Sequence, residues 1–330
     1  MMDFSELARL ASGHVEARII QAGVQVGLFD CIADQTLDAA QIAAALGTDL
    51  RATELLLNSL AALAILQKQE ERFSLTVAAK TYLVSNSPKS LCGMIRFDAS
   101  LWGCWERLAD ALRAGKPARP ADMYQDDPAE TETFIKAMDS LVKARGDAEA
   151  LANAFDWNEI TDLLDIGSGP ATYPIHLCRK FPRLSATVFD LPGTLRITQR
   201  YVREAGLEAR ITLAGGDYRS DPIPGSYDVI FLSNIIHGES ADENQRLMTK
   251  LAANLKSGGK IIIKDHILDR SRANPPVGAI FSLLTLLTTE SGRCYGFDEV
   301  KAWLERADLR RVRQIDLPPP LTSSLITAEK

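Results

Sequence analysis

A short glycine-containing segment in the middle of the chain has the residue types needed to hold a nucleoside. The apolar run 163–166 includes one acid, Asp165, and is followed at once by Gly167 and Gly169. This pattern predicts a buried strand, a sharp turn and a helix that begins near Ala171. Glycines in such a turn let a ligand approach the backbone closely, and the helix directs its free N–H groups and positive dipole end at that ligand.

A second acid follows the next predicted strand. The apolar run 186–189 ends at Asp190, where a carboxylate can accept hydrogen bonds from ribose hydroxyls. The glycine turn alone is also compatible with a strand-to-helix turn that binds nothing, because Thr172 stands where the dinucleotide fingerprint has its third glycine. Asp190 therefore favours a nucleoside-binding half of a doubly wound sheet.

Two further candidates follow the third and fourth predicted strands. In Gly216-Asp217-Tyr218, the acid could accept from an adenine amino group and the tyrosine could stack on the ring. His237 follows the fourth strand, and a neutral imidazole there could take a proton from a substrate hydroxyl. A polar turn and a structural histidine are the alternatives. The position at the carboxyl edge of a parallel sheet, beside Asp190, favours the functional interpretation.

The elements that must position these residues alternate between strand and helix from about residue 160 onward. Such alternation is typical of a mostly parallel sheet, so the expected fold class is α/β, with a doubly wound, Rossmann-like sheet and an antiparallel last strand. The expected strands are 162–166, 186–189, 211–214, 229–233 and 260–264, with an antiparallel pair near 312–315 and 324–327, and the helices include 242–254 and 297–307.

The first 95 residues predict a winged-helix arrangement. Asp3 and Glu6 can form a capping box for a first helix whose apolar spacing continues to Leu28. Helices over 36–46 and 51–65 and a hairpin of 66–69 with 72–76 complete the pattern. Many winged helices bind DNA through a recognition helix with a basic exposed face. Here the positive charge of Arg51 on the expected recognition helix is balanced by Glu54, and the hairpin carries two glutamates. We therefore expect residues 1–95 to form a homodimerisation domain that binds no nucleic acid.

Residues 96–155 are expected to be a helical linker that lines the substrate pocket, followed by the catalytic domain over 156–330. Four apolar or aromatic side chains there could surround a flat ligand, although ordinary interdomain core is the alternative for each of them. These are Trp102, Trp105, Phe134 and Met138, and we add Asn234 and Leu284 to the expected pocket.

Composition narrows the class of protein further. The 330 residues carry a formal net charge of −6, which disfavours a polyanionic partner. The five cysteines form no C-x-x-C pair, so free thiols in a reducing cytoplasm are expected. The four histidines are scattered along the sequence, so we expect no metal site. The sequence contains no long apolar segment, so we expect no membrane span.

These motifs together resemble the S-adenosylmethionine-dependent small-molecule O-methyltransferases related to plant caffeic acid O-methyltransferase. The matching segments are Leu-Leu-Asp-Ile-Gly-Ser-Gly, Phe-Asp-Leu-Pro, Gly-Gly-Asp-Tyr, the histidine after the fourth strand, and Gly-Gly-Lys-Ile-Ile-Ile. The resemblance covers nearly the whole chain, because that family also has an N-terminal winged-helix dimerisation domain. It implies S-adenosyl-L-methionine as the cofactor and a small metabolite as the methyl acceptor.

The resemblance also implies a role for each matching residue. His237 matches the general base, and Asp265 matches an acid that orients it. Ser233 stands where many plant members have a cofactor-contacting lysine. The implied cofactor-binding residues are Gly167, Gly169, Asp190, Leu191, Gly216, Asp217, Tyr218 and Ser233.

Two departures from the family pattern leave other interpretations open. Gly238-Glu239 replaces the usual Asp-Trp after the base, and Cys294 stands where a second orienting glutamate is usual. A C- or N-methyltransferase, or a member that acts by proximity alone, is therefore an alternative to an O-methyltransferase. A nicotinamide dehydrogenase would share the glycine turn and Asp190 but would not explain Gly-Asp-Tyr. A DNA-binding regulator would use the winged helix.

Overall fold

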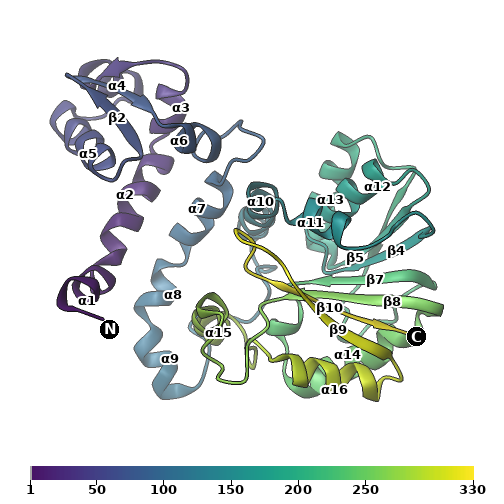
Figure 1. The fold of residues 1–330 in the computed structure, drawn as a ribbon. Coiled ribbons are helices and arrows are strands. Elements are labelled where there is room, and N and C mark those ends of the chain that lie inside the picture. Colours follow the sequence, from purple (N-terminus) through teal and green to yellow (C-terminus); the bar gives the residue numbers. More distant parts are fainter. Residues whose placement is uncertain (1) are drawn as a thin grey trace. The chain divides into compact units, whose positions relative to one another are not determined.

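The computed structural model describes residues 2–330 and groups the chain into two compact units (Figure 1). The first unit contains the chain up to Trp102 together with Lys136–Ala144, and the second contains Gly103–Ile135 and Arg145–Lys330. The helical segment 96–155 thus contributes to both units. Within the described residues, no helix combines the length and the apolar character that crossing a membrane requires.

The first unit is mainly helical, and its first helix starts at the expected capping box. Asp3 Oδ1 accepts from the Glu6 N–H at 2.8 Å, and Glu6 Oε2 accepts from the Asp3 N–H at 3.0 Å. The expected continuous helix to Leu28 was wrong, because the chain breaks at Ser12. The Ser12 hydroxyl donates to the Ala8 carbonyl at 2.7 Å, and Gly13 follows. The helices are α1 (Phe4–Ala11), α2 (Gly13–Gln25), α3 (Leu28–Ile32), α4 (Ala39–Leu46), α5 (Leu50–Ala62), α6 (Val77–Tyr82) and α7 (Cys92–Ser100).

A small antiparallel sheet completes the winged-helix layout of this unit. Strands β2 (Leu66–Gln69) and β3 (Arg72–Leu75) form the expected hairpin, and β1 (Leu37–Asp38) pairs with β3. The side chains that pack between this sheet and the helices are almost completely buried, and they include Phe29, Leu57, Leu60 and Phe73.

The second unit contains the seven-stranded sheet, in the order β6-β5-β4-β7-β8-β10-β9. The first five strands in this order are parallel, and β10 is antiparallel to both β8 and β9. The expected α/β fold with an antiparallel strand near its edge is therefore confirmed. The strands are β4 (Asp162–Ile166), β5 (Ser185–Asp190), β6 (Ile211–Gly215), β7 (Tyr227–Ser233), β8 (Leu255–Asp265), β9 (Arg310–Asp316) and β10 (Ser324–Glu329).

Helices pack against this sheet and bury its apolar side chains. On one side, Met248 of α14 (Ala241–Ala253) and Leu304 of α16 (Phe297–Arg306) pack with Ile230 and Ile263 in one fully buried cluster. The other elements of the second half of the chain are α8 (Trp102–Glu106), α9 (Leu108–Ala114), α10 (Pro128–Arg145), α11 (Asp147–Ala154), α12 (Thr172–Lys180), α13 (Pro192–Glu204), the short 3-10 helix η1 (Ile236–Gly238) and α15 (Pro276–Thr288).

The parallel register aligns the carboxyl ends of five consecutive strands. Ile166 of β4 is level with Phe189 of β5 and with Leu232 of β7, and Ser233 is level with Lys264 of β8. The residues that follow these strands therefore come together at one edge of the sheet, which is where ligands bind in open α/β sheets.

Candidate functional site

The turn after β4 has a backbone that requires glycine. Gly167 has a φ of +61° and Gly169 a φ of +58°, both in the left-handed region. A Cβ at Gly167 would overlap the Ile235 side chain and would lie 4.0 Å from Tyr218 Cε1. Gly167 therefore lies where the loops after three strands meet, and the position has no room for a side chain.

Asp190 fixes this turn from the neighbouring strand. Its Oδ2 accepts from the Gly169 N–H at 2.8 Å, and its Oδ1 accepts from the Leu191 N–H at 2.7 Å. Burial raises the pKa of Asp190 to about 6, although these hydrogen bonds oppose the shift. A nearly buried carboxylate at the carboxyl end of β5 suits a hydroxyl-rich ligand such as ribose.

A second acid in this region is not exposed to a ligand. Asp165 is 1% exposed within β4, and its Oδ2 accepts from the Ser168 hydroxyl at 2.5 Å. Burial raises the pKa of Asp165 to about 8, and the charge of Asp190 adds to the shift. Asp165 is therefore a protonated structural acid at neutral pH.

The loop after β6 contains a tight turn and a charged pair. A Cβ at Gly216 would lie 2.5 Å from Phe189 Cζ, so this position also requires glycine. Asp217 binds Arg219 through both oxygens, with Arg219 Nε 3.0 Å from Oδ1 and Nη2 2.8 Å from Oδ2. The Tyr218 hydroxyl donates to Glu239 Oε1 at 2.7 Å.

The loop after β7 begins with a strained residue. Asn234 has a φ of +57°, and its N–H donates to the Lys264 carbonyl at 2.8 Å. Its buried Oδ1 has no hydrogen-bond partner. Strain of this kind concentrates at functional sites, and here it directs the chain from Ser233 toward η1, which carries His237.

His237 and Asp265 form a hydrogen-bonded pair across the ends of β7 and β8. His237 Nδ1 lies 2.8 Å from Asp265 Oδ1, which also accepts from the His266 N–H at 2.7 Å. Burial would raise the pKa of Asp265, but the charge and hydrogen bond of His237 and the contribution of His266 lower it overall. An ionised Asp265 can only accept, so Nδ1 of His237 donates this hydrogen bond, and Nε2 is the ring nitrogen left to face a substrate.

The ring of Phe281, on α15, packs against both histidines. Its centroid lies 4.8 Å from that of His237, in an edge-on arrangement, and 5.1 Å from that of His266. His266 Nδ1 lies 2.9 Å from the Thr322 carbonyl, and burial lowers the pKa of His266, so this second imidazole is neutral. Phe281 therefore packs between the two imidazoles and helps to hold the ring of His237 in its orientation.

Cys294 supplies no second carboxylate to this pair. It is 2% exposed, and its N–H donates to the Ser282 hydroxyl at 3.1 Å. Burial raises the pKa of the Cys294 thiol to about 12, and the charge of Asp265 contributes to the shift. A protonated thiol cannot stabilise an imidazolium as a carboxylate does, so Asp265 is the anion that faces His237.

The expected pocket residues are distributed over both units. Trp105 packs against a small buried cluster that includes Leu287 of α15, and Phe134 stacks on Tyr124 with a centroid distance of 4.6 Å. Leu284 is half-buried on α15, the helix that carries Phe281. Trp102 and Met138 belong to the first unit, where the Trp102 indole N–H donates to Gln21 Oε1 at 2.6 Å. Their role in a pocket stays a prediction.

Sequence reasoning missed two residues that the structure brings to this edge. Phe281 contacts the imidazole of His237, and Glu239 accepts from Tyr218. Glu239 follows His237 by two positions, so its place in the same loop was visible in the sequence, but its burial was not. Phe281 lies in an apolar helix, and nothing in the spacing of that helix distinguishes it from core residues.

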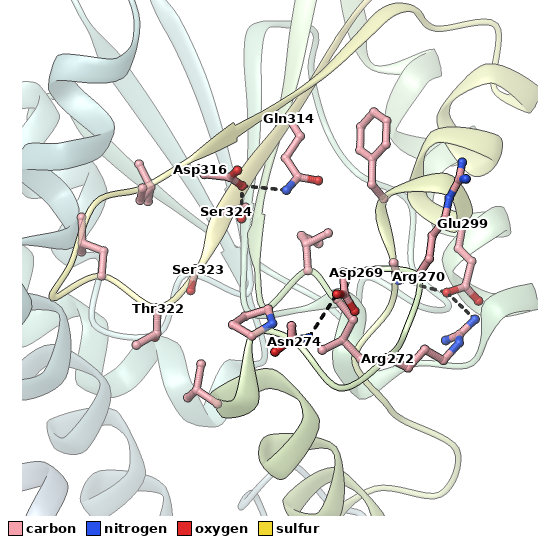
Figure 2. Close-up of a pocket in the computed structure, with 18 of the residues that line it drawn as sticks. Asp269, Arg270, Arg272, Asn274, Glu299, Gln314, Asp316, Thr322, Ser323 and Ser324 are labelled. Atoms are coloured by element: carbon pink, nitrogen blue, oxygen red, sulfur yellow. Dashed lines mark hydrogen bonds and ion pairs between the residues drawn. The ribbon is translucent and has the colours of Figure 1, made fainter. Parts of the chain in front are cut away.

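A separate groove of about 1060 Å³ lies beside the β9–β10 hairpin (Figure 2). In Figure 2, Asp316 contacts Gln314 and Ser324, and Arg272 contacts Glu299. The groove is lined by none of the residues expected to bind the cofactor or to act in catalysis. Among residues 2–330, no group of three or more His, Cys, Asp or Glu side chains is arranged to hold a metal.

Comparisons with known proteins agree with the fold and with the sheet edge described above. The model of the O-methyltransferase domain matches residues 105–308, and the model of the O-methyltransferase dimerisation domain matches residues 8–85. The chain therefore belongs to the O-methyltransferase family. It is an S-adenosylmethionine-dependent O-methyltransferase, and it forms a homodimer.

Similar proteins span the whole chain. The 3-hydroxy-5-methyl-1-naphthoate 3-O-methyltransferase of Streptomyces sahachiroi is 29% identical, over 98% of this chain and 94% of its own length. The tetracenomycin polyketide synthesis 8-O-methyl transferase TcmO of Streptomyces glaucescens is 28% identical, over 97% and 95% of the two chains. Human N-acetylserotonin methyltransferase, solved in complex with SAM, shares the fold with a TM-score of 0.90 at 24% identity, over 100% and 98% of the two chains.

The site residues fit this cofactor. Gly167 and Gly169 present backbone without side chains at the end of β4, and Asp190 presents a buried carboxylate at the end of β5. Bare backbone beside a carboxylate suits the chemistry of a nucleoside such as that of S-adenosylmethionine.

Proposed function

We propose that this protein methylates a hydroxyl group of a small aromatic or polyketide-like metabolite in the cytoplasm, with His237 as the general base. The observation that supports this most directly is the His237–Asp265 pair at the same sheet edge as Gly167 and Asp190. An oriented imidazole beside a cofactor site is the arrangement that deprotonation of an acceptor requires.

The cofactor supplies an electrophilic methyl group on a sulfonium. Its nucleoside half would lie against the turn after β4, where Gly167 and Gly169 carry no side chains. Asp190 would accept from the ribose hydroxyls. The full set of residues that we propose around the cofactor is Gly167, Gly169, Asp190, Leu191, Gly216, Asp217, Tyr218 and Ser233.

His237 would take the proton from the acceptor hydroxyl at Nε2. Asp265 holds the opposite ring nitrogen and stabilises the positive charge that develops on the imidazole. Phe281 packs on the ring and limits the access of water to it. The protein thus contributes a correctly oriented base and a position for the acceptor, and proximity of the two reactants provides much of the rate acceleration.

The aromatic nature of the acceptor is supported by the side chains near α15 and by the relatives. Trp105, Phe134 and Phe281 provide flat apolar surfaces within the second unit. Asn234 and Leu284, also of the second unit, complete the pocket that we propose. The relatives named above act on a naphthoate and in tetracenomycin polyketide synthesis.

The second candidate function is methylation of nitrogen or carbon by proximity alone. It is favoured by the single carboxylate at the base, because Cys294 is a buried thiol and Asp265 Oδ2 has no hydrogen-bond partner. A weaker base would suffice for an acceptor that needs no deprotonation. This alternative predicts an activity that does not depend on His237.

A matched panel of acceptors separates the two functions. Purified protein is incubated with S-adenosylmethionine and hydroxynaphthoic acids, and in parallel with the corresponding aminonaphthoic acids, and the products are identified by mass spectrometry. Methylation of oxygen that is lost in His237→Ala is the expected result. Methylation of the amino series alone, with His237→Ala active, would contradict a hydroxyl acceptor and a histidine base.

A further inference from the structure

The second imidazole at this edge of the sheet, His266, is held by the protein at one ring nitrogen only. It follows β8 directly, and its backbone N–H donates to Asp265 Oδ1 at 2.7 Å. Its Nδ1 lies 2.9 Å from the Thr322 carbonyl, which can only accept, so Nδ1 is the donor of this hydrogen bond. The ring is therefore fixed in one orientation, and Nε2 is the nitrogen that the protein leaves unused.

The Nε2 atom of His266 has no hydrogen-bond partner within residues 2–330, although the residue is only 8% exposed. It is not one of the side-chain atoms of these residues that are both sealed from solvent and unpaired, so it reaches accessible space. Burial lowers the pKa of His266 against the opposing effects of Asp265 and Thr322, so the ring is neutral and Nε2 presents a lone pair. An unpaired acceptor in such a nearly buried place suits a ligand that donates.

Helix α15 lies against both His266 and His237. A Cβ at Gly278 would lie 3.2 Å from the Cβ of His266, so the helix approaches the end of β8 closely because this position carries no side chain. Nearly one turn further along α15, the ring of Phe281 lies 4.8 Å from that of His237 and 5.1 Å from that of His266. The groove beside the β9–β10 hairpin is lined by Thr322 but not by His266. These contacts place the second imidazole beside the proposed base.

We infer that His266 is a specificity-determining residue for the methyl acceptor, and that its Nε2 accepts a hydrogen bond from a second hydroxyl near the one that is methylated. The acceptor is then a dihydroxy aromatic compound, with one hydroxyl at His237 and the other at His266. Thr322 offers His266 a neutral carbonyl, whereas Asp265 offers His237 a carboxylate. His266 therefore binds a hydroxyl without taking its proton, and the second hydroxyl stays unmethylated. The inference rests on the hydroxyl acceptor of the proposed function.

Pairs of acceptors that differ in one hydroxyl test the inference. The full-length protein is saturated with S-adenosylhomocysteine and titrated by calorimetry with each dihydroxynaphthalene isomer, and with the naphthols that lack one of its two hydroxyls. For at least one isomer, wild type should bind the diol about 5- to 100-fold more tightly than the naphthols, because a naphthol leaves the nearly buried Nε2 acceptor unpaired. An equal Kd within every pair would overturn the inference.

Two substitutions of His266 separate recognition of the acceptor from a structural role. In His266→Asn, the side-chain amide can still donate to the Thr322 carbonyl, as Nδ1 does, but no acceptor stands at the position of Nε2. In His266→Gln, the longer amide can place its oxygen near that position, but it gives up the bond to Thr322. The preference for the diol should fall below about twofold in His266→Asn and persist in part in His266→Gln. The reverse order would show that His266 acts only through Thr322.

Two further readouts complete the test. The Kd for S-adenosylhomocysteine should stay within about threefold of wild type in both variants, and a larger change would show that the substitutions distort the whole sheet edge, which contradicts a role in specificity. Turnover separates this inference from the proposed function. A diol preference that depends on His266, without methyl transfer, would contradict His237 as the base and support His266. Methylation of diol and naphthol with equal Kd and equal kcat/KM would contradict only the role of His266.

Discussion

His237 Nδ1 lies 2.8 Å from Asp265 Oδ1, and Asp265 is only 1% exposed. The other oxygen of Asp265 is buried and has no hydrogen-bond partner among residues 2–330. A buried carboxylate with so few donors keeps its negative charge because the histidine lies beside it. The pair is therefore coupled: the acid fixes the tautomer of the imidazole, and the imidazole keeps the acid ionised.

The first prediction follows from this coupling. His237→Ala should reduce methyl transfer by about 10²–10⁴-fold, the range for a positioned base, and the lone carboxylate favours the lower end. Asp265→Asn should reduce the rate of methyl transfer less than His237→Ala does. The imidazole remains present in this variant, but its orientation and the stabilisation of its positive charge are weakened. Single-turnover rates on a hydroxyl acceptor would measure both effects.

Cofactor affinity provides the control for these two variants. Neither side chain belongs to the proposed cofactor set, so the Kd for S-adenosylhomocysteine should stay within about threefold of wild type. Near wild-type turnover in His237→Ala would remove the residue from the mechanism and leave it as part of the pocket wall.

The second prediction concerns the pH dependence of cofactor binding. Because the pKa of Asp190 is raised to about 6, its carboxylate is ionised at pH 7.5 and protonated at pH 5. A protonated Asp190 accepts more weakly from ribose, so affinity for S-adenosylhomocysteine should fall as the pH drops below about 6, by up to about tenfold per pH unit. Calorimetry between pH 5 and 8 would follow this decline.

Asp190→Asn is the matched variant for the pH series. It should bind S-adenosylhomocysteine more weakly than wild type at pH 7.5, by about 1.5–3 kcal/mol for a lost charge-assisted hydrogen bond. Its affinity should change little between pH 5 and 7. A wild-type affinity that is flat over the same interval would argue against Asp190 as the ribose ligand.

The third prediction uses Asp165, which binds a proton in the folded state. Its pKa is about 8 when folded and near 3.8 in its unperturbed form, so the folded state binds more protons between these values. The contribution of this group to stability is therefore present at low pH and is lost as the pH rises through about 8. Asp165→Asn, which mimics the protonated acid, should gain stability relative to wild type as the pH is raised from 4 to 8.

Urea unfolding at several pH values would test whether the stability of Asp165→Asn relative to wild type rises with pH. Asp165→Ala is the contrasting variant, because it leaves the Ser168 hydroxyl without its acceptor and opens a cavity in β4. It should lose about 1–3 kcal/mol at pH 4, where wild type carries the protonated acid, and less than this as the pH rises toward 8. If Asp165→Asn were less stable than wild type at pH 8, Asp165 would have to be ionised in the folded protein.

The sequence alone was sufficient to predict the parallel sheet and the residues at the carboxyl ends of its strands. Strand β4 is a mostly apolar run that Gly167 follows, so it was expected with its observed bounds Asp162–Ile166. Parallel pairing then brings Asp190 and His237 to one edge without further information. Local periodicity and a general rule of sheet geometry were enough for this part.

Other features depend on contacts that no local pattern encodes. The break at Ser12 results from a side chain that bonds to the carbonyl four residues earlier, which an apolar periodicity does not reveal. The burial of Glu239 depends on Tyr218, Tyr295 and α14, which are distant in the sequence. A charged residue after a predicted base would otherwise be assigned to the solvated surface.

The last prediction concerns the helix that begins the chain. Helix α1 buries no residue, and its apolar side chains are solvent-exposed: Phe4 by 86%, Leu7 by 57% and Leu10 by 56%. An eight-residue helix is marginal in water without a surface to cover its apolar face. Because the family forms dimers through this domain, we expect the second copy of the chain to cover that face, within an interface built largely by residues 1–95.

Leu7→Asp/Leu10→Asp should therefore shift the protein from dimer toward monomer. Burial of each leucine contributes about 1.5–3 kcal/mol to the free energy of association. Two-fold symmetry places each substitution twice in the same interface. The Kd of the dimer should therefore rise by at least about 100-fold. Sedimentation equilibrium at micromolar concentration would measure the shift. Leu112→Asp, at a 59% exposed position on α9 outside residues 1–95, is the control and should leave the dimer intact. A leucine double variant that sediments as a dimer like wild type would show that α1 lies outside the interface.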